Sequence, residues 1–135
     1  MAERTLVFVK PDGVHRGLVG EVISRFERKG LQIIELSVRT LDPEFADRHY
    51  AEHVGKPWYP QLREFITSGP IVAMIVEGDQ VVEVVRAMVG ATDARTAAPG
   101  SIRGDLANSN RLNLVHASDS AESAKREIDL FFPGS

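Results

Sequence analysis

Two short, uninterrupted apolar segments, residues 5–9 and 71–76, constrain the fold of this chain more than any other feature of its sequence. Both are rich in β-branched side chains, and turn residues follow each of them, Pro11 and Gly13 in one case and Gly78 in the other. Apolar runs of this length between turn signals predict strands that are buried on both faces. A chain of 135 residues has room for one core around such strands, so we expect a single domain over residues 1–135.

The rest of the chain alternates between helical and strand-like patterns. Residues 34–38 alternate apolar and polar side chains, which predicts a strand with one face in water. Residues 91–111 show no sustained period and are expected to form a long loop, followed by a short strand at 112–115 and a last helix that starts at Asp119. Apolar residues at helical spacing predict further helices at residues 18–29, 43–50, 59–66 and 81–89, of which the middle two would form a hairpin.

This order of elements predicts an α+β fold. Each connection between strands but one contains a helix, and the helices are too few to shield both faces of a four-stranded sheet. A split β-α-β sheet with its helices on one side therefore fits the pattern best. The other face of the sheet would remain available for a contact between subunits.

Composition and charge exclude several classes of protein. The chain carries 16 Lys and Arg against 19 Asp and Glu, a net charge of −3, whereas a protein that covers nucleic acid needs a basic surplus. We therefore expect no specific nucleic acid partner. Because cysteine is absent, disulfides, thiolate nucleophiles and cysteine-bound zinc are excluded. The first apolar run is too short for a signal peptide and no stretch would span a membrane, so we expect a cytoplasmic protein without a membrane partner.

Anion-binding side chains are present without a glycine-rich phosphate loop. Neither a G-x-x-x-x-G-K-[ST] nor a G-x-G-x-x-G motif occurs, so any phosphate would have to be held by side chains. Arg86, Thr92 and Arg103 are good phosphate donors in or just before the long loop. For each arginine taken alone, a place on the solvated surface is the commoner role.

His116 is the candidate nucleophile. It follows the predicted strand at 112–115 and precedes the last helix, where a side chain is exposed near a positive helix N-terminus. A half-neutral imidazole can attack phosphorus when a second group holds its other nitrogen, and Glu127 could be that group. Asn113 lies three residues earlier, so the two side chains can converge only if the strand ends between them. Taken alone, however, a single histidine more often has a structural or incidental role.

Two other histidines have a spacing that could suit a metal ion. His49 and His53 lie four residues apart on one face of a predicted helix, but no third ligand is evident. A surface pair is the simpler interpretation. His15 likewise ranks below His116 as a functional candidate.

The chain resembles the nucleoside diphosphate kinases in three separated motifs, NLVHASD (residues 113–119), KPDG (10–13) and PGSIRGD (99–105). The likeness covers essentially the whole chain. It implies a ferredoxin-like, four-stranded antiparallel sheet (βαββαβ) with an inserted helical hairpin and a long loop before the last strand. It also implies Mg²⁺-dependent, ping-pong transfer of the γ-phosphate from ATP or another nucleoside triphosphate to a nucleoside diphosphate, through a phosphohistidine.

The resemblance assigns a role to each candidate residue. His116 would be the nucleophile, supported by Glu127 and Ser118, with Tyr50 beside the transferred phosphate. The substrate contacts would be Arg86, Thr92 and Arg103 for the phosphates, Lys10 and Asn113 for sugar hydroxyls and phosphate, and Trp58 and Leu62 for the base. Mg²⁺ would be held mainly by nucleotide phosphates and water, without a dedicated protein site. The family also implies a homo-oligomer, for which we expect a hexamer.

Three positions depart from the family pattern. Ala117 stands where glycine is usual, Trp58 where phenylalanine is usual, and Ala94 where proline is common. A Cβ at residue 117 could slow the reaction if that residue needed a positive φ. Ala94 could loosen the loop that carries Arg103, and Trp58 should change base affinity without removing activity.

Two other functions were weighed against the enzyme. An RNA-binding module of the same topology would need exposed aromatic side chains on its strands, and the predicted strands carry only Phe8. A relative that had lost catalysis should lack one of His116, Lys10, Arg103 or Asn113, and all four are present. The sequence therefore favours the enzyme.

Overall fold

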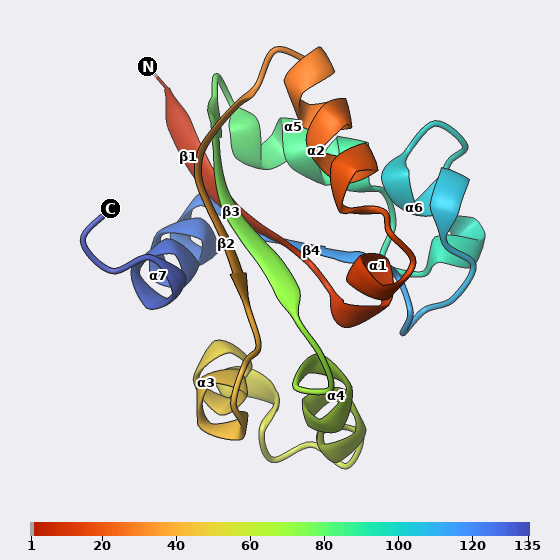
Figure 1. Cartoon of the computed structure of the whole chain (residues 1–135), viewed down its shortest axis with the longest axis vertical. Coiled ribbons are helices and arrows are strands. Elements are labelled where there is room, and N and C mark those ends of the chain that lie inside the picture. Colours follow the sequence, from red (N-terminus) through yellow and green to blue (C-terminus); the bar gives the residue numbers. More distant parts are fainter. Residues whose placement is uncertain (1) are drawn as a thin grey trace.

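Four strands form one antiparallel sheet at the centre of the molecule (Figure 1). The computed structural model describes residues 2–135, and its strands are β1 (Glu3–Val9), β2 (Gln32–Arg39), β3 (Ile71–Gly78) and β4 (Val115–Ala117). Their order in the sheet is β2-β3-β1-β4, and every neighbouring pair is antiparallel. The two apolar segments become the adjacent central strands β1 and β3. The predicted α+β fold with a four-stranded antiparallel sheet is confirmed.

Helices cover both faces of the sheet, so the expectation of helices on one side only is wrong. One face packs against α2 (Val19–Arg28) and α5 (Val81–Val89). The opposite face packs against α3 (Pro43–His49), α4 (Tyr59–Ile66) and α7 (Ala121–Phe131). The expectation failed because α7 packs along β1 on the second face, and the hairpin of α3 and α4 adds Ala46 and Ile66 to the same apolar cluster. Neither these helices nor the others within residues 2–135 are long and apolar enough to cross a membrane.

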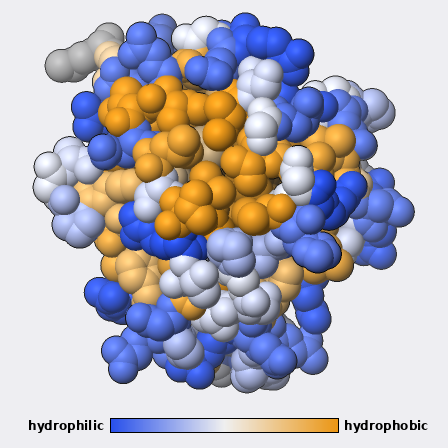
Figure 2. All heavy atoms as spheres, viewed as in Figure 1, coloured by the Kyte–Doolittle hydropathy of each residue, from blue (hydrophilic) through white to orange (hydrophobic). Residues whose placement is uncertain are grey.

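The edge strand β2 exposes apolar side chains. A register shift between Ile33 and Glu35 places Ile34 on the face of α7, whereas Leu36 and Val38 lie on the opposite face. At this edge Leu36 is 54% exposed and Val38 is 70% exposed. Figure 2, in the same view as Figure 1, shows apolar side chains gathered on this side of the molecule. The surface available for a subunit contact is therefore this edge rather than a bare face of the sheet.

Short helices interrupt segments that the sequence predicted as turn or loop. The KPDG motif leads into α1 (Pro11–His15), and the long segment at 91–111 contains a 3₁₀ helix (Ala94–Thr96) and α6 (Ile102–Leu106). Helices of three to five residues are too short to show a helical period in the sequence. In α6, a Cβ on Gly104 would lie 2.0 Å from the carbonyl oxygen of Ala98, so only glycine fits there.

The last strand begins three residues later than predicted. Leu114 has a φ of 74°, in the left-handed region, so the extended strand can start only at Val115. As a result His116 lies within β4 and not after it. Helix α7 is capped by Ser120 rather than Asp119, because the Ser120 hydroxyl accepts the backbone N–H of Ser123 at 3.0 Å.

Candidate active site

One cleft of about 400 Å³ gathers the side chains that the sequence singled out. Ten of the eleven candidate residues line it: Lys10, Tyr50, Trp58, Leu62, Arg86, Thr92, Arg103, Asn113, His116 and Glu127. The eleventh, Ser118, is fully buried and contacts Glu127. These residues come from the end of β1, the helical hairpin, α5, the long segment, β4 and α7. The fold therefore brings together residues that are more than 100 positions apart in the sequence, such as Lys10 and Asn113.

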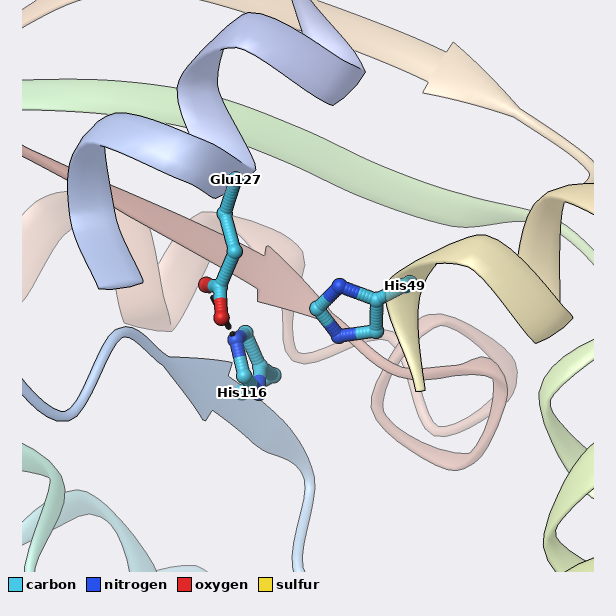
Figure 3. A group of neighbouring side chains, drawn as sticks. All are labelled: His49, His116 and Glu127. Carbon is cyan, nitrogen blue, oxygen red and sulfur yellow. Dashed lines mark hydrogen bonds and ion pairs between the residues drawn. The ribbon is translucent and has the colours of Figure 1, made fainter. Parts of the chain in front are cut away.

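Glu127 holds the imidazole of His116 by one nitrogen (Figure 3). The distance from Nε2 of His116 to Oε1 of Glu127 is 2.8 Å, and the Ser118 hydroxyl donates to the same carboxylate oxygen at 2.7 Å. The Phe8 ring stacks on the imidazole, with centroids 4.8 Å apart and an interplanar angle of 23°. Because Nε2 is engaged by the carboxylate, Nδ1 is the nitrogen that remains free for chemistry.

Asn113 and His116 reach the same cleft because the chain turns sharply between them. Leu114, in the left-handed region, donates its backbone N–H to Oδ2 of Asp12 at 3.1 Å and accepts the backbone N–H of Lys10 at 2.8 Å. A left-handed leucine is strained, so these two contacts are needed to hold it. Asp12 belongs to the KPDG motif, yet the sequence offered no sign of this supporting role.

The cleft contains four cationic side chains, Lys10, Arg86, Arg103 and Arg126. Nζ of Lys10 donates to Oδ1 of Asn113 at 2.8 Å, and Arg86 donates to the carbonyl of Ala117 at 3.3 Å. Burial, followed by the nearby charge of Arg103, lowers the pKa of Lys10 to about 8. Sequence analysis missed Arg126, which projects from α7 and donates to the backbone carbonyl of His49.

Arg103 is 4% exposed, and its guanidinium both hydrogen-bonds to the backbone and lines the cleft. It donates to three backbone carbonyls: from Nε to Asn113 at 3.2 Å, from Nη1 to Gly90 at 3.0 Å and from Nη2 to Val115 at 2.7 Å. Burial, followed by the charge of Arg86, lowers the pKa of Arg103 to about 10. Each terminal nitrogen keeps one further hydrogen that could bind an anion.

Trp58 and Leu62 line the cleft together with a neighbouring hollow of about 420 Å³ that also includes Thr92. The Trp58 side chain is 45% exposed, and its ring centroid lies 5.1 Å from that of His53. Nζ of Lys56 lies 5.7 Å from the centre of the indole. The indole is therefore within reach of solvent and of a flat ligand.

His49 and His53 do not form the surface pair that the sequence predicted. Helix α3 ends at His49, which is 6% exposed, and His53 lies beyond it in a 3₁₀ helix (Ala51–His53). The ring of His49 meets His116 edge to face, with centroids 4.7 Å apart. Burial, followed by the charge of His116, lowers the pKa of His49 to about 2, so it is neutral. Burial also raises the pKa of the neighbouring Tyr50, which keeps its hydroxyl protonated.

Two of the residues that depart from the family pattern, Ala117 and Ala94, are compatible with the backbone conformation at their positions. Within residues 2–135 the non-glycine residues with positive φ are Gln80 and Leu114, so Ala117 adopts the extended conformation of β4 without strain. The N–H of Ala94 donates to the carbonyl of Ser109 at 3.2 Å, a hydrogen bond that proline could not make. Ala94 therefore makes a hydrogen bond that joins the two ends of the long segment, and a proline at this position would not make it.

Comparisons with known proteins agree with this fold and cleft. The family model for nucleoside diphosphate kinase matches residues 3–135. A nucleoside diphosphate kinase of Parafrankia sp. is 62% identical over 133 residues, which are 98% of this chain and 97% of the relative. One from Mycobacterium tuberculosis is 61% identical over 135 residues, covering 99% of each chain.

Solved structures show the same likeness. The nucleoside diphosphate kinase of Halobacterium salinarum in complex with CDP has a TM-score of 0.95 and 50% identity, covering 98% of this chain and 88% of that chain. The nucleoside diphosphate kinase of Aquifex aeolicus has a TM-score of 0.94 and 41% identity, covering 99% of this chain and 97% of that chain. Together, the sheet, the cleft and these relatives place the chain among the phosphotransferases that act on nucleotides. Within that class it belongs to the nucleoside diphosphate kinase family.

Proposed function

We propose that this chain transfers the γ-phosphate of ATP or another nucleoside triphosphate to a nucleoside diphosphate, in two half-reactions at one site. The contact between Nε2 of His116 and Glu127 supports this proposal most directly. If Nε2 donates its proton to the carboxylate, the lone pair of the imidazole lies on Nδ1. This makes Nδ1 the nucleophilic atom.

The two half-reactions are the reverse of one another. In the first, a bond forms between Nδ1 of His116 and the γ-phosphorus, and the bond to the β–γ bridging oxygen breaks as the nucleoside diphosphate leaves. In the second, a terminal oxygen of another nucleoside diphosphate attacks the same phosphorus, and the bond to Nδ1 breaks. Glu127 balances the charge that the ring gains while phosphorylated.

The other cleft residues take the roles that position a nucleotide. Arg86, Thr92 and Arg103 bind the phosphates, and Tyr50 lies beside the transferred group. Lys10 and Asn113, already hydrogen-bonded to each other, contact sugar hydroxyls and phosphate. Trp58 and Leu62 close on the base, and stacking of this kind accepts every base. The Halobacterium salinarum relative was solved with CDP, a nucleoside diphosphate of the class proposed here.

Mg²⁺ is the proposed metal, held mainly by the nucleotide. Within residues 2–135 the one group of possible metal ligands is His49, His116 and Glu127, whereas Mg²⁺ prefers an octahedron of oxygens. The donors of the cleft therefore fit an ion that is bound by phosphates and water. When bound, Mg²⁺ neutralises phosphate charge. Lys10, Arg86 and Arg103 supply the remaining positive charge from the protein.

We also propose that the chain acts in the cytoplasm as a homo-oligomer, specifically a hexamer. The exposed Leu36 and Val38 on the edge strand β2 support a contact between subunits there. The number six follows from the family resemblance, and the absence of cysteine suits a reducing compartment. Leu36→Glu should lower the mass found by analytical ultracentrifugation if this edge is a contact.

Transfer of labelled phosphate tests the proposed activity. Incubation with γ-labelled ATP and Mg²⁺ should label the protein in an acid-labile, base-stable form, and the label should pass to added GDP. Initial-rate lines at different GDP concentrations should be parallel, because one histidine serves both half-reactions. His116→Ala should abolish labelling. Label that persists on His15, His49 or His53 in this variant would refute the assignment.

A further inference from the structure

His49 is a buried histidine that the proposed reaction does not use. It is 6% exposed, and neither of its ring nitrogens has a hydrogen-bonding partner within residues 2–135. Unpaired polar atoms in a protein interior are destabilising, and buried polar groups in native proteins nearly always have partners. The His49 imidazole is therefore placed for an interaction that the protein itself does not provide.

The nitrogens of His49 face the pair formed by His116 and Glu127. Figure 3 shows the edge of the His49 ring that carries both nitrogens turned toward that pair. One ligand atom from each of the three side chains lies within 4.8 Å of the other two. The two imidazole planes are at 84° to each other, so the edge of one ring meets the face of the other.

We propose that His49, His116 and Glu127 form a binding site for a borderline-soft divalent cation such as Zn²⁺ in the nucleotide-free protein. Two histidines and one glutamate are a ligand set that Zn²⁺ accepts, with a fourth position left for water or a substrate oxygen. Mg²⁺ would not occupy this site, because it prefers oxygen ligands.

The site needs a modest rearrangement to close around an ion. Two ligands of a tetrahedral zinc ion lie about 3.4 Å apart when each bond is about 2.1 Å long. The contact between His116 and Glu127, at 2.8 Å, is shorter than this, and the 4.8 Å spread of the whole group is longer. Binding therefore requires Glu127 to open slightly and His49 to rotate inward.

Occupation of this site would inhibit phosphate transfer. The ion would engage the imidazole of His116 and take Glu127 away from it. Because the imidazole would lose the carboxylate that balances its charge, Zn²⁺ should slow phosphorylation at Nδ1 of His116. This consequence rests on the proposed role of His116, whereas binding of the ion does not.

Metal titration of the nucleotide-free chain tests the site. We expect calorimetry to show one Zn²⁺ per chain, and Co²⁺ to give the visible absorption of a low-coordinate site. His49→Phe keeps an aromatic ring but removes both nitrogens. Loss of a residue that only supports a metal ligand costs about 10–100-fold in affinity, so this loss of a ligand should cost at least about 100-fold. His15→Phe removes an exposed histidine outside the group and should leave Zn²⁺ affinity unchanged.

A second variant, a folding control and a separate activity assay complete the test of the metal site. His49→Gln is a second variant with a polar side chain, and urea unfolding of each variant shows that it is folded at the assay temperature. Unchanged Zn²⁺ affinity in both folded His49 variants would overturn the proposal, as would loss of binding in His15→Phe alone. Labelling by γ-labelled ATP without zinc reports the proposed activity separately. A parent chain that is labelled but binds no Zn²⁺ would refute only the metal site.

Discussion

Glu127→Gln removes one charge from the site while keeping its shape. Oε1 of Glu127 accepts hydrogen bonds from both His116 and Ser118, and the amide oxygen of glutamine can accept the same two. The side chain of Glu127 is 9% exposed, so solvent screens its charge only weakly. The substitution therefore tests whether the carboxylate charge assists phosphorylation of His116.

The expected effect follows from the strength of a charge-assisted hydrogen bond. Such a bond contributes about 1.5–3 kcal/mol, and the imidazole gains positive charge as its Nδ1 bonds to phosphorus. Losing this contribution in the transition state should slow phosphorylation by about 10- to 150-fold. Affinity for ADP should change little, because Glu127 is assigned no contact with the nucleotide.

Rapid-quench, single-turnover labelling with γ-labelled ATP measures this rate directly. Ser118→Ala is the matched comparison, because it removes one donor to the carboxylate and leaves the charge. We expect it to slow the reaction less than Glu127→Gln does. Phosphorylation of Glu127→Gln within twofold of the parent rate, in a protein of parent stability, would show that the carboxylate charge has no part in catalysis.

Further predictions concern three of the residues assigned to the nucleotide. Trp58 is the only tryptophan, so its fluorescence should change when nucleotide binds, and an unchanged spectrum at saturation would place it outside the site. Trp58→Ala should weaken binding of purine and pyrimidine nucleotides alike, by about 1–3 kcal/mol. Because the pKa of Lys10 is about 8 in the free protein, ADP affinity should fall as pH rises through that value and Lys10 loses its charge. Lys10→Arg should remove this pH dependence, so calorimetry that finds the same inflection in the variant would exclude Lys10 as its source. Arg103→Lys keeps the charge but cannot donate to all three carbonyls, so urea unfolding should show a loss of about 2–4 kcal/mol in the free energy of unfolding. The single-turnover rate of this variant should fall more than its affinity for ADP. A parent rate in this variant would remove Arg103 from catalysis.

The central strands, and ten of the residues that line the cleft, could be predicted from the sequence and its family resemblance. Uninterrupted apolar runs identified β1 and β3, and the spacing of Asn113 and His116 showed that their side chains converge only if a strand ends between them. The structure satisfies that condition through Leu114. Its conformation could not be predicted, because it depends on contacts with Asp12 and Lys10, more than 100 positions away.

Other features depend on tertiary contacts that leave no local pattern. A register shift in β2 moved Ile34 away from the face of Leu36 and Val38, although the three residues alternate regularly in the sequence. The burial of His49 was missed for a similar reason. Its spacing to His53 suggested one helix face, but α3 ends at His49 and the chain continues in a different helix.

Phe8 links the imidazole of His116 to the interior of the protein. Its ring stacks on His116 on one side and lies 5.5 Å from the ring of Phe131 in the core. The proposed nucleophile thus packs on the same apolar layer that holds α7 on the sheet, so we expect its position to depend on that layer. Heating should therefore abolish phosphate transfer and melt the fold at one temperature, without an earlier stage in which the chain is folded but inert.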